Sequence, residues 1–300
     1  MTKPRMTNLD WKIAERKLEI AREVAEELAT LLHLAAPVDP FNVAKAELPV
    51  LRVLAEDFGN QFDGLLEYHA AKRRFLMFVN TKYDSNCHRG GHHPRTRFSA
   101  AHELGHYFLD HHRACLMQGV TSHPSQSEFR SNAMMEREAD AFASTLIMPS
   151  RLMRESVNES ELTIDRVIDL ASRFEASLVS TIIRTVQLSD FPAAVVGIRD
   201  GSVKWSFQAD CLVPAGCYPP QRGPVLSATA RKKWDAFIAG DNEQTMGHAY
   251  LREWFRTYDR DRLESLPVTE HHLPVSVMET LVVLLTIPED ELFPDTDRDW

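Results

Sequence analysis

The chain has 300 residues, of which 44% are hydrophobic and 26% are charged, and its formal net charge is −9. These values are typical of a soluble globular protein with one large or two ordinary domains. The negative balance disfavours a broad nucleic-acid-binding surface, and no window approaches the roughly 20 apolar residues of a membrane-spanning helix.

The first 17 residues contain no apolar stretch of the kind found in secretion signals. The four cysteines are scattered along the chain and match neither a disulfide framework nor a zinc ribbon. A reducing cytoplasm is therefore the expected location.

The N-terminal part predicts helices followed by a small sheet. Apolar residues recur at three- and four-residue steps over residues 10–34, which predicts one long amphipathic helix, and a second short helix should run from Asp39 to about Ala46. Residues 49–54, 62–68 and 74–80 are strand candidates, and the last two read as a hairpin. The histidine-rich segment 84–96 is expected to be a solvated loop.

Residues 97–112 carry the pattern His102-Glu103-Leu104-Gly105-His106, which is the H-E-x-x-H pattern of zinc peptidases. On a helix, positions four apart return to within roughly 40° of each other, so both histidines can share one metal ion. Glu103 would then lie beside the metal, as a general base requires. Pro94 and Thr96 can begin this helix, with Thr96 as N-cap. His111, nine residues after His102, does not share the ligand face well.

A catalytic zinc site needs a third protein ligand and one position open for water. Residues 113–133 are predicted to be an irregular connection, in which His123 is a possible proton donor or oxyanion partner. The next segment is helical, and Glu136 is the best candidate for the third ligand. Asp140 lies four residues later and could accept a hydrogen bond from a ligating histidine. Glu138 is the weaker candidate, and a solvated acidic face is the alternative for this helix.

Further helices are predicted over residues 150–158, 162–174 and 177–187, and the last two resemble a helix-turn-helix. Clear positive charge comes only from Arg173 and Arg184, so a scaffold role is favoured over DNA reading.

The C-terminal part begins with a hairpin over residues 193–207, centred on Asp200-Gly201. A loop is expected over residues 214–224, and partly helical stretches are expected over 225–239 and 244–258. Residues 274–287 are ambiguous between helix and strand, and residues 289–300 form an acidic tail.

The two motifs together resemble the ImmA/IrrE family of metallopeptidases. The resemblance rests on RFSAAHELGHY and EREADAFASTLIMP and extends over about residues 45–190. It implies a zincin-like domain with His102, His106 and Glu136 on zinc and Glu103 as the catalytic base. It also implies regulatory proteolysis, usually of a helix-turn-helix repressor. In zincins an exposed strand edge near the metal often holds the substrate, which here suggests residues 75–80.

We therefore expect an α+β fold. Its predicted parts are an N-terminal helical segment (residues 1–44), a zincin-like peptidase domain (45–160) and a helix-turn-helix-like segment (161–190). A C-terminal α/β domain follows (191–300), for which a sensory role is a candidate. The expected function is zinc-dependent cleavage of a specific regulatory protein, with manganese or iron as other candidate metals. The alternative is a metal-containing regulator that binds a partner without cutting it. Direct nucleic-acid binding and membrane association are not expected, and the oligomeric state is left open.

Overall fold

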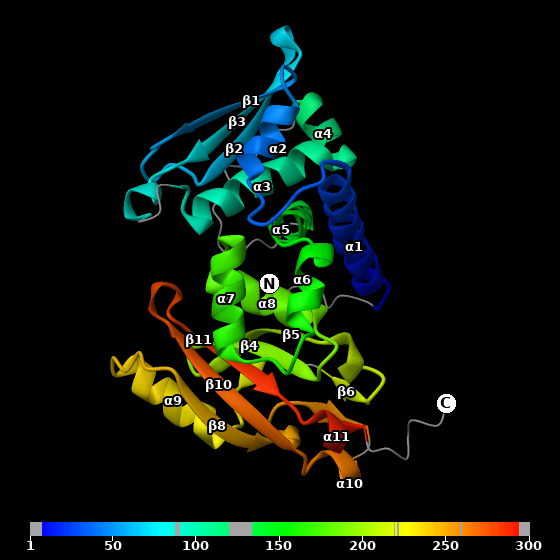
Figure 1. Ribbon diagram of the computed structural model, residues 1–300, viewed down its shortest axis with the longest axis vertical. Helices are drawn as coiled ribbons and strands as arrows, with labels where there is room; N and C mark the ends of the chain where they lie inside the picture. The colour runs from blue at the N-terminus through cyan, green and yellow to red at the C-terminus, as the bar shows by residue number, and fades with distance from the viewer. Residues whose placement is uncertain are drawn as a thin grey trace, which may run out of the picture. The chain divides into compact units, whose positions relative to one another are not determined.

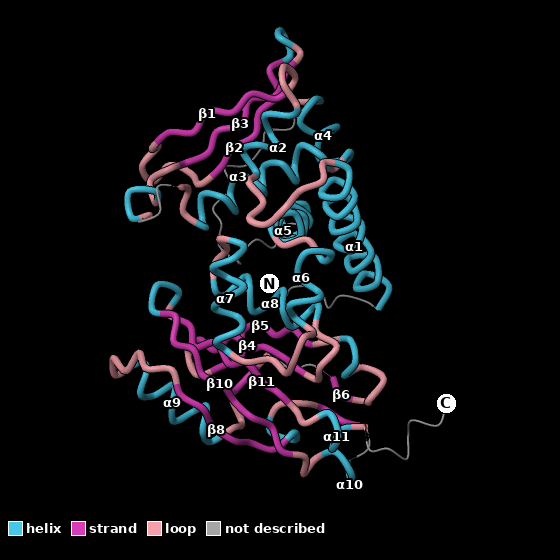
Figure 2. The backbone as a smooth tube through the Cα atoms, in the orientation of Figure 1, coloured by secondary structure: helices cyan, strands magenta, loops and turns pink. Residues whose placement is uncertain are grey.

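A computed structural model describes residues 8–87, 91–119, 134–218, 220, 222–258 and 260–293. The chain divides into two compact units, which are treated separately below. The first comprises Met1–Leu152 with Ala171–Ser177, and the second comprises Met153–Leu170 with Leu178–Trp300. Helices and strands are mixed along the whole chain, as an α+β protein requires (Figures 1 and 2).

The first unit combines helices with a three-stranded sheet whose order is β1-β3-β2. Strand β3 pairs in parallel with β1 and antiparallel with β2. The strands are β1 (Leu51–Glu56), β2 (Gly64–His69) and β3 (Arg74–Asn80), and the helices are α1 (Asn8–Leu31), α2 (Pro40–Ala46), α3 (Pro94–Phe108), α4 (Asp110–Met117) and α5 (Met134–Ile147). The predicted hairpin is therefore β2–β3, and the two predicted N-terminal helices are α1 and α2.

The core of this unit lies between the sheet and α3. Alternate residues of β3 are buried, namely Phe75, Met77 and Val79, because successive side chains of a strand point to opposite faces. The Phe75 ring packs edge-on against that of Tyr107, a buried residue of α3, with ring centroids 5.2 Å apart. Helix α5 in turn packs against α3 and α1 (Figure 1).

The expectation that residues 75–80 present a free strand edge is wrong. These residues form β3, the central strand, and both of its edges are already paired. Within this described sheet β1 and β2 are the two edge strands, and each of them pairs with β3 alone. An extended peptide could therefore add to the sheet beside β1 or β2 and not beside β3.

The start of α3 also differs from the expectation. The N-cap is His93, whose Nδ1 accepts a hydrogen bond from the backbone N–H of Arg95, while Thr96 lies inside the first turn. The Thr96 hydroxyl instead donates to Asp84, 2.7 Å away. Part of the expected solvated loop is therefore tied to the helix it precedes.

The second unit is built on a six-stranded sheet with the order β7-β5-β4-β11-β10-β8, and all of its pairings are antiparallel. Its strands, with the separate pair β6–β9, are β4 (Ala193–Arg199), β5 (Ser202–Gln208), β6 (Cys217–Tyr218), β7 (Gly223–Pro224), β8 (Thr245–Tyr250), β9 (Arg256–Thr257), β10 (Pro267–Val275) and β11 (Thr280–Thr286). The remaining helices of the chain are α6 (Ser150–Val157), α7 (Ile164–Phe174), α8 (Leu178–Leu188), α9 (Ala228–Ile238), α10 (Arg260–Leu263) and α11 (Glu289–Leu292).

Helices cover both faces of this sheet. Strands β4 and β11 are buried at almost every position, which requires cover on each side. Ala194, Val196 and Ile198 lie on one face in a cluster that includes Phe237 of α9. Helix α8 contacts β4 and β5.

Some C-terminal expectations were correct and others were not. The hairpin at Asp200-Gly201 is present as β4–β5, and both turn residues have positive φ. Residues 244–258, expected to be partly helical, instead contain β8 and β9, and the ambiguous segment 274–287 consists mainly of β11 with the end of β10. The acidic tail begins with the short helix α11, and residues 294–300 lie outside the described residues.

The helix-turn-helix-like pair is present as α7 and α8, joined at Glu175, which has a φ of 50°. Most side chains of α8 are buried, and these include Arg184. A recognition helix needs an exposed face to enter a groove, so this burial argues against DNA reading by α8. Within the described residues, no helix has the length and apolar character needed to cross a membrane.

Candidate metal centre

Side chains from two helices converge in the first unit. His102 Nε2 and His106 Nε2 of α3 lie 3.1 Å apart, because the two residues are separated by about one helical turn. Glu136 of α5 approaches both: its Oε2 lies 3.3 Å from His102 Nε2, and its Oε1 lies 3.6 Å from His106 Nε2. The structure thus brings together the three residues that the sequence predicted as metal ligands.

These distances suit a bound cation. Zinc bonds of about 2.0–2.1 Å in tetrahedral geometry place neighbouring ligand atoms about 3.3–3.4 Å apart. The three observed separations lie on either side of that value. Two imidazoles and one carboxylate are also a donor set that binds divalent transition metals, and the geometry therefore fits a metal ion.

A close helix crossing makes this convergence possible. A Cβ atom added to Gly105 would lie 3.1 Å from Ala139 Cα and 3.2 Å from the Ala139 carbonyl oxygen. Nine in ten of the contacts that real Cβ atoms make are longer than these distances, so the neighbouring helix would have to give way by a few tenths of an ångström. Gly105, inside the H-E-x-x-H motif, therefore lets α5 approach α3 closely enough for Glu136 to reach the histidines.

Asp140 also contacts the candidate centre, as expected from its position one turn after Glu136. Its Oδ1 lies 2.9 Å from His102 Nδ1, and because a carboxylate can only accept, His102 donates this hydrogen bond. Burial by itself would lower the pKa of His102, but Asp140 and Glu136 raise that pKa to about 10. Burial and the neighbouring histidines lower the pKa of His106. The carboxylates of Asp140 and Glu136 thus favour a positive charge on His102.

Glu103, the predicted base, is buried against the start of β2. A Cβ atom at Gly64 would lie only 2.5 Å from Glu103 Oε1 and 2.9 Å from Glu103 Cγ. A side chain at this position would therefore have to displace the Glu103 side chain. The carboxylate lies between its own helix and the first residue of the edge strand β2.

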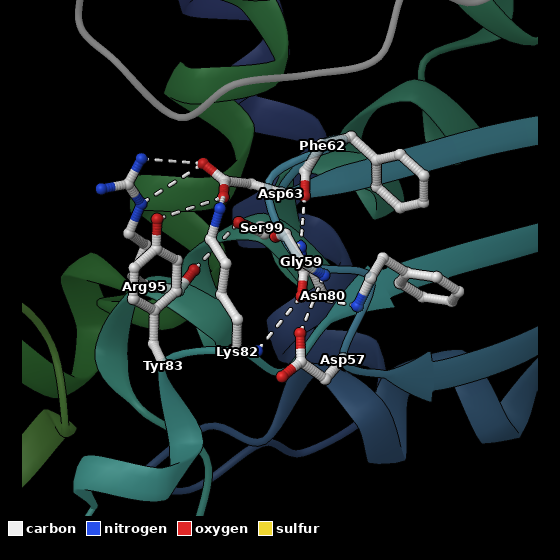
Figure 3. A network of polar contacts seen from close by, with 10 residues as sticks. Asp57, Gly59, Phe62, Asp63, Asn80, Lys82, Tyr83, Arg95 and Ser99 are labelled. Carbon is white, nitrogen blue, oxygen red and sulfur yellow. Dashed lines mark hydrogen bonds and ion pairs between the residues drawn. The ribbon is translucent and has the colours of Figure 1, made fainter.

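A polar network holds Asp63, the residue before Gly64 (Figure 3). The carboxylate of Asp63 accepts from Arg95 Nη2 at 2.8 Å and forms an ion pair with Lys82 Nζ at 3.3 Å. Arg95 belongs to the first turn of α3, and Lys82 follows β3. The network thus connects β2 with the helix that carries Glu103.

Asn80 holds the preceding loop. Its side-chain amide donates to the carbonyl oxygens of Gly59 and Phe62 at 2.8 and 2.6 Å, and its oxygen accepts from the backbone N–H groups of Phe58 and Lys82, both at 3.1 Å (Figure 3). The Asn80 side chain is itself buried, while its four hydrogen-bond partners lie in partly exposed loops. No pattern in the sequence singles out this residue.

A second group of possible ligands was not predicted. His111 Nε2 and His112 Nε2 each lie 2.8 Å from Glu138 Oε2. The group arises because α3 ends at Phe108 and α4 begins at Asp110 after an extended residue, Leu109. If one helix ran unbroken from residue 97 to residue 112, these two histidines would point in other directions. His123, the predicted proton donor or oxyanion partner, lies outside the described residues.

Comparisons with known proteins agree with this chemistry. Residues 88–185 match the family model described as the IrrE N-terminal-like domain, Peptidase_M78. No curated protein sequence matches the chain. Among solved structures, the chain is similar to one described as a Mycobacterium tuberculosis transcriptional regulator, with a TM-score of 0.55, 12% sequence identity, and coverage of 95% of this chain and 82% of that one. At this identity the similarity shows a shared fold.

Proposed function

We propose, from the match of residues 88–185 to the IrrE N-terminal-like domain model, Peptidase_M78, that this chain is an ImmA/IrrE-family zinc-dependent endopeptidase that cuts a specific regulatory protein. One observation carries the proposal. The facing nitrogen and oxygen atoms of His102, His106 and Glu136 lie 3.1, 3.3 and 3.6 Å apart, close to the spacing of two atoms bound to one zinc ion. The peptidase domain that surrounds them has, in this proposal, a zincin-like arrangement.

We assign distinct roles to the side chains of the centre. His102, His106 and Glu136 hold the ion, and Asp140 orients the His102 ring through its hydrogen bond to Nδ1. When bound, zinc acidifies a water molecule and polarises the scissile carbonyl group. Manganese and iron are alternatives that metal analysis distinguishes from zinc.

Glu103 acts as the general base. It removes a proton from the attacking water as the new bond forms between the water oxygen and the carbonyl carbon. When the C–N bond breaks, Glu103 passes this proton to the departing amine nitrogen. Contact with Gly64 limits where the carboxylate can lie, which supports a base held ready beside the ion.

The substrate chain binds along β2. Strand β2 is one of the two edge strands of its sheet, and its first residue lies against Glu103. An extended peptide added there would form main-chain hydrogen bonds and place a peptide bond near the base. This assignment replaces the one to residues 75–80, which β1 and β2 exclude.

We propose a DNA-binding repressor as the target, in a stress or mobile-element response. The support is the family resemblance, and a protein named as a transcriptional regulator shares the fold. Residues 191–300 would then carry a sensory role.

The test uses purified protein and the helix-turn-helix repressor encoded beside its gene, incubated with and without chelator. Wild-type protein should release fragments that chelator prevents. Glu103→Gln should keep its zinc and release none, and Glu136→Ala should lose zinc. Normal cleavage by Glu103→Gln would contradict the role of this base. A stable, uncut complex with the wild-type protein would favour the alternative function, a metal-containing regulator that binds its partner.

A further inference from the structure

His106 has a buried neighbour behind the metal centre. Its Nδ1, the ring nitrogen that faces away from His102, lies 3.0 Å from His112 Nδ1. The opposite side of the His112 ring meets Glu138, with Nε2 2.8 Å from Oε2. His112 and Glu138 are 0% and 1% exposed, so water cannot replace either partner. The three residues form one chain of hydrogen bonds leading from the centre into the core.

Glu138 determines where each proton lies in this chain of hydrogen bonds. Glu138 Oε2 lies 2.8 Å from Nε2 of both His111 and His112, and a carboxylate oxygen can only accept from them. His112 must then carry a proton on Nε2. A neutral imidazole has one ring proton, so the His112 Nδ1 has a lone pair and can accept.

The same reasoning extends to the next ring. Since His112 Nδ1 has no proton, the 3.0 Å contact is a hydrogen bond only if His106 Nδ1 donates it. Neutral His106 then has an unprotonated Nε2. This is the nitrogen that faces His102 and Glu136, and a metal ligand must have its lone pair there.

A second metal site is the competing interpretation of the outer residues. His111, His112 and Glu138 can place ligand atoms within 4.8 Å of one another. A metal on His112 Nε2, however, moves the proton of that ring to Nδ1. His106 would then have to accept at Nδ1 and carry its own proton on Nε2, where it could no longer bind the first ion. Lys17, whose Nζ lies 3.9 Å from Glu138 Oε1, adds a positive charge beside this second position.

We propose that His112 and Glu138 are positioning residues that fix the tautomer and ring orientation of His106, so that its Nε2 is ready to bind the metal. The inference rests on the proposed function, because it assumes that His106 is a metal ligand. His102 has the direct partner Asp140, whereas His106 depends on this two-residue relay.

Zinc affinity, measured by competition with a chromophoric chelator, tests the relay. His112→Phe keeps the ring volume and removes the acceptor, and it should weaken zinc binding by about 10- to 100-fold. His112→Asn offers an amide oxygen to His106 and should recover most of that loss. His111→Phe is the matched control: it also removes a partner of Glu138, but it leaves His106 untouched and should bind zinc like the wild type.

A tautomer measurement on the unaltered protein complements the variants and does not depend on how they fold. In metal-free protein labelled with ¹⁵N-histidine, the His106 ring should carry its proton on Nδ1. A proton on Nε2, or wild-type zinc affinity in a folded His112→Phe protein, would overturn the relay. Two zinc ions per chain, with the second lost in His111→Phe, would also overturn it and support a second metal site. If wild-type protein bound no metal at all, the proposed function itself would fail.

Discussion

The carboxylate of Glu103 lies directly against the backbone of Gly64, so closely that a single added carbon at residue 64 would come within 2.5 Å of Glu103 Oε1. One residue of an edge strand thus limits the space available to the proposed catalytic base. Asp63, the residue before Gly64, is held by Arg95 and Lys82. The contact connects the proposed substrate-binding strand β2 with the proposed catalytic base on α3, and both proposals can be tested there.

Gly64→Ala should reduce peptide cleavage and leave metal binding intact. The three atoms nearest to the new methyl group all belong to the Glu103 side chain, so we expect Glu103 to be displaced and the metal ligands to stay in place. A misplacement of about 1 Å at a reacting group can cost on the order of 100-fold in rate. Cleavage rate and zinc content measure the two effects separately. Gly91→Ala is the control, since no atom lies within 4 Å of a Cβ added there; equal rates for both variants would refute the contact's importance.

Gly105→Ala should weaken metal binding. Alanine normally stabilises a helix interior by about 0.5–1 kcal/mol relative to glycine. Here the methyl group would press on the backbone of Ala139 and on Phe142 Cβ, 3.3 Å away, and push α5 outward together with Glu136. Chelator competition and thermal unfolding measure the outcome. A variant that is more stable and binds zinc normally would show that the crossing does not depend on this close contact.

Asn80→Ala should destabilise the first unit. The change leaves two backbone N–H groups and two carbonyl groups near β2 without their partner. Unsatisfied buried polar groups cost about 1–3 kcal/mol each, with partial relief where water enters the loop. We expect a loss of about 2–3 kcal/mol in urea unfolding. Asn242→Ala, a change at an exposed residue of the second unit, should alter the midpoint far less.

Asp84 should make stability depend on acid pH. Burial would raise the pKa of this carboxyl group, but hydrogen bonds from His92, the Thr96 hydroxyl and the His93 N–H lower it below its ordinary value of 3.8. Its contribution is therefore present above pH 3.8 and is lost as pH falls through the lower pKa of the folded state. Asp84→Asn should reduce stability at pH 7 and flatten the decline below pH 4.

Urea midpoints at several pH values between 7 and 3 measure this effect. Asp169→Asn removes one exposed carboxylate of α7 and serves as the control for net charge. An acid decline as steep in Asp84→Asn as in the wild type would show that this carboxyl group is not responsible.

Local periodicity predicted much of the candidate centre. The four-residue spacing of His102 and His106, and that of Glu136 and Asp140, places each pair on one helix face whatever surrounds it. In the structure these four side chains do lie together, although their roles remain proposals. The approach of the two helices follows from the small residues Gly105 and Ala139, which a helical pattern alone does not pair.

Features that depend on tertiary structure could not be predicted in the same way. Leu109 interrupts the helix without a proline or glycine, and this break turns His112 back toward His106. The order of strands in the first sheet likewise depends on a parallel pairing between β1 and β3, which no turn signal encodes. Residues 244–258 form strands because they pair with β10 and with β6, partners that are distant in the sequence.

An anomalous difference map, collected at the zinc edge from crystals grown with the metal, tests the central claim most directly. It should show one strong peak per chain, bounded by His102 Nε2, His106 Nε2 and the Glu136 carboxylate, with the fourth position free of protein atoms. A peak among His111, His112 and Glu138 instead, or a fourth protein ligand that closes the site, would contradict the hydrolase proposed here.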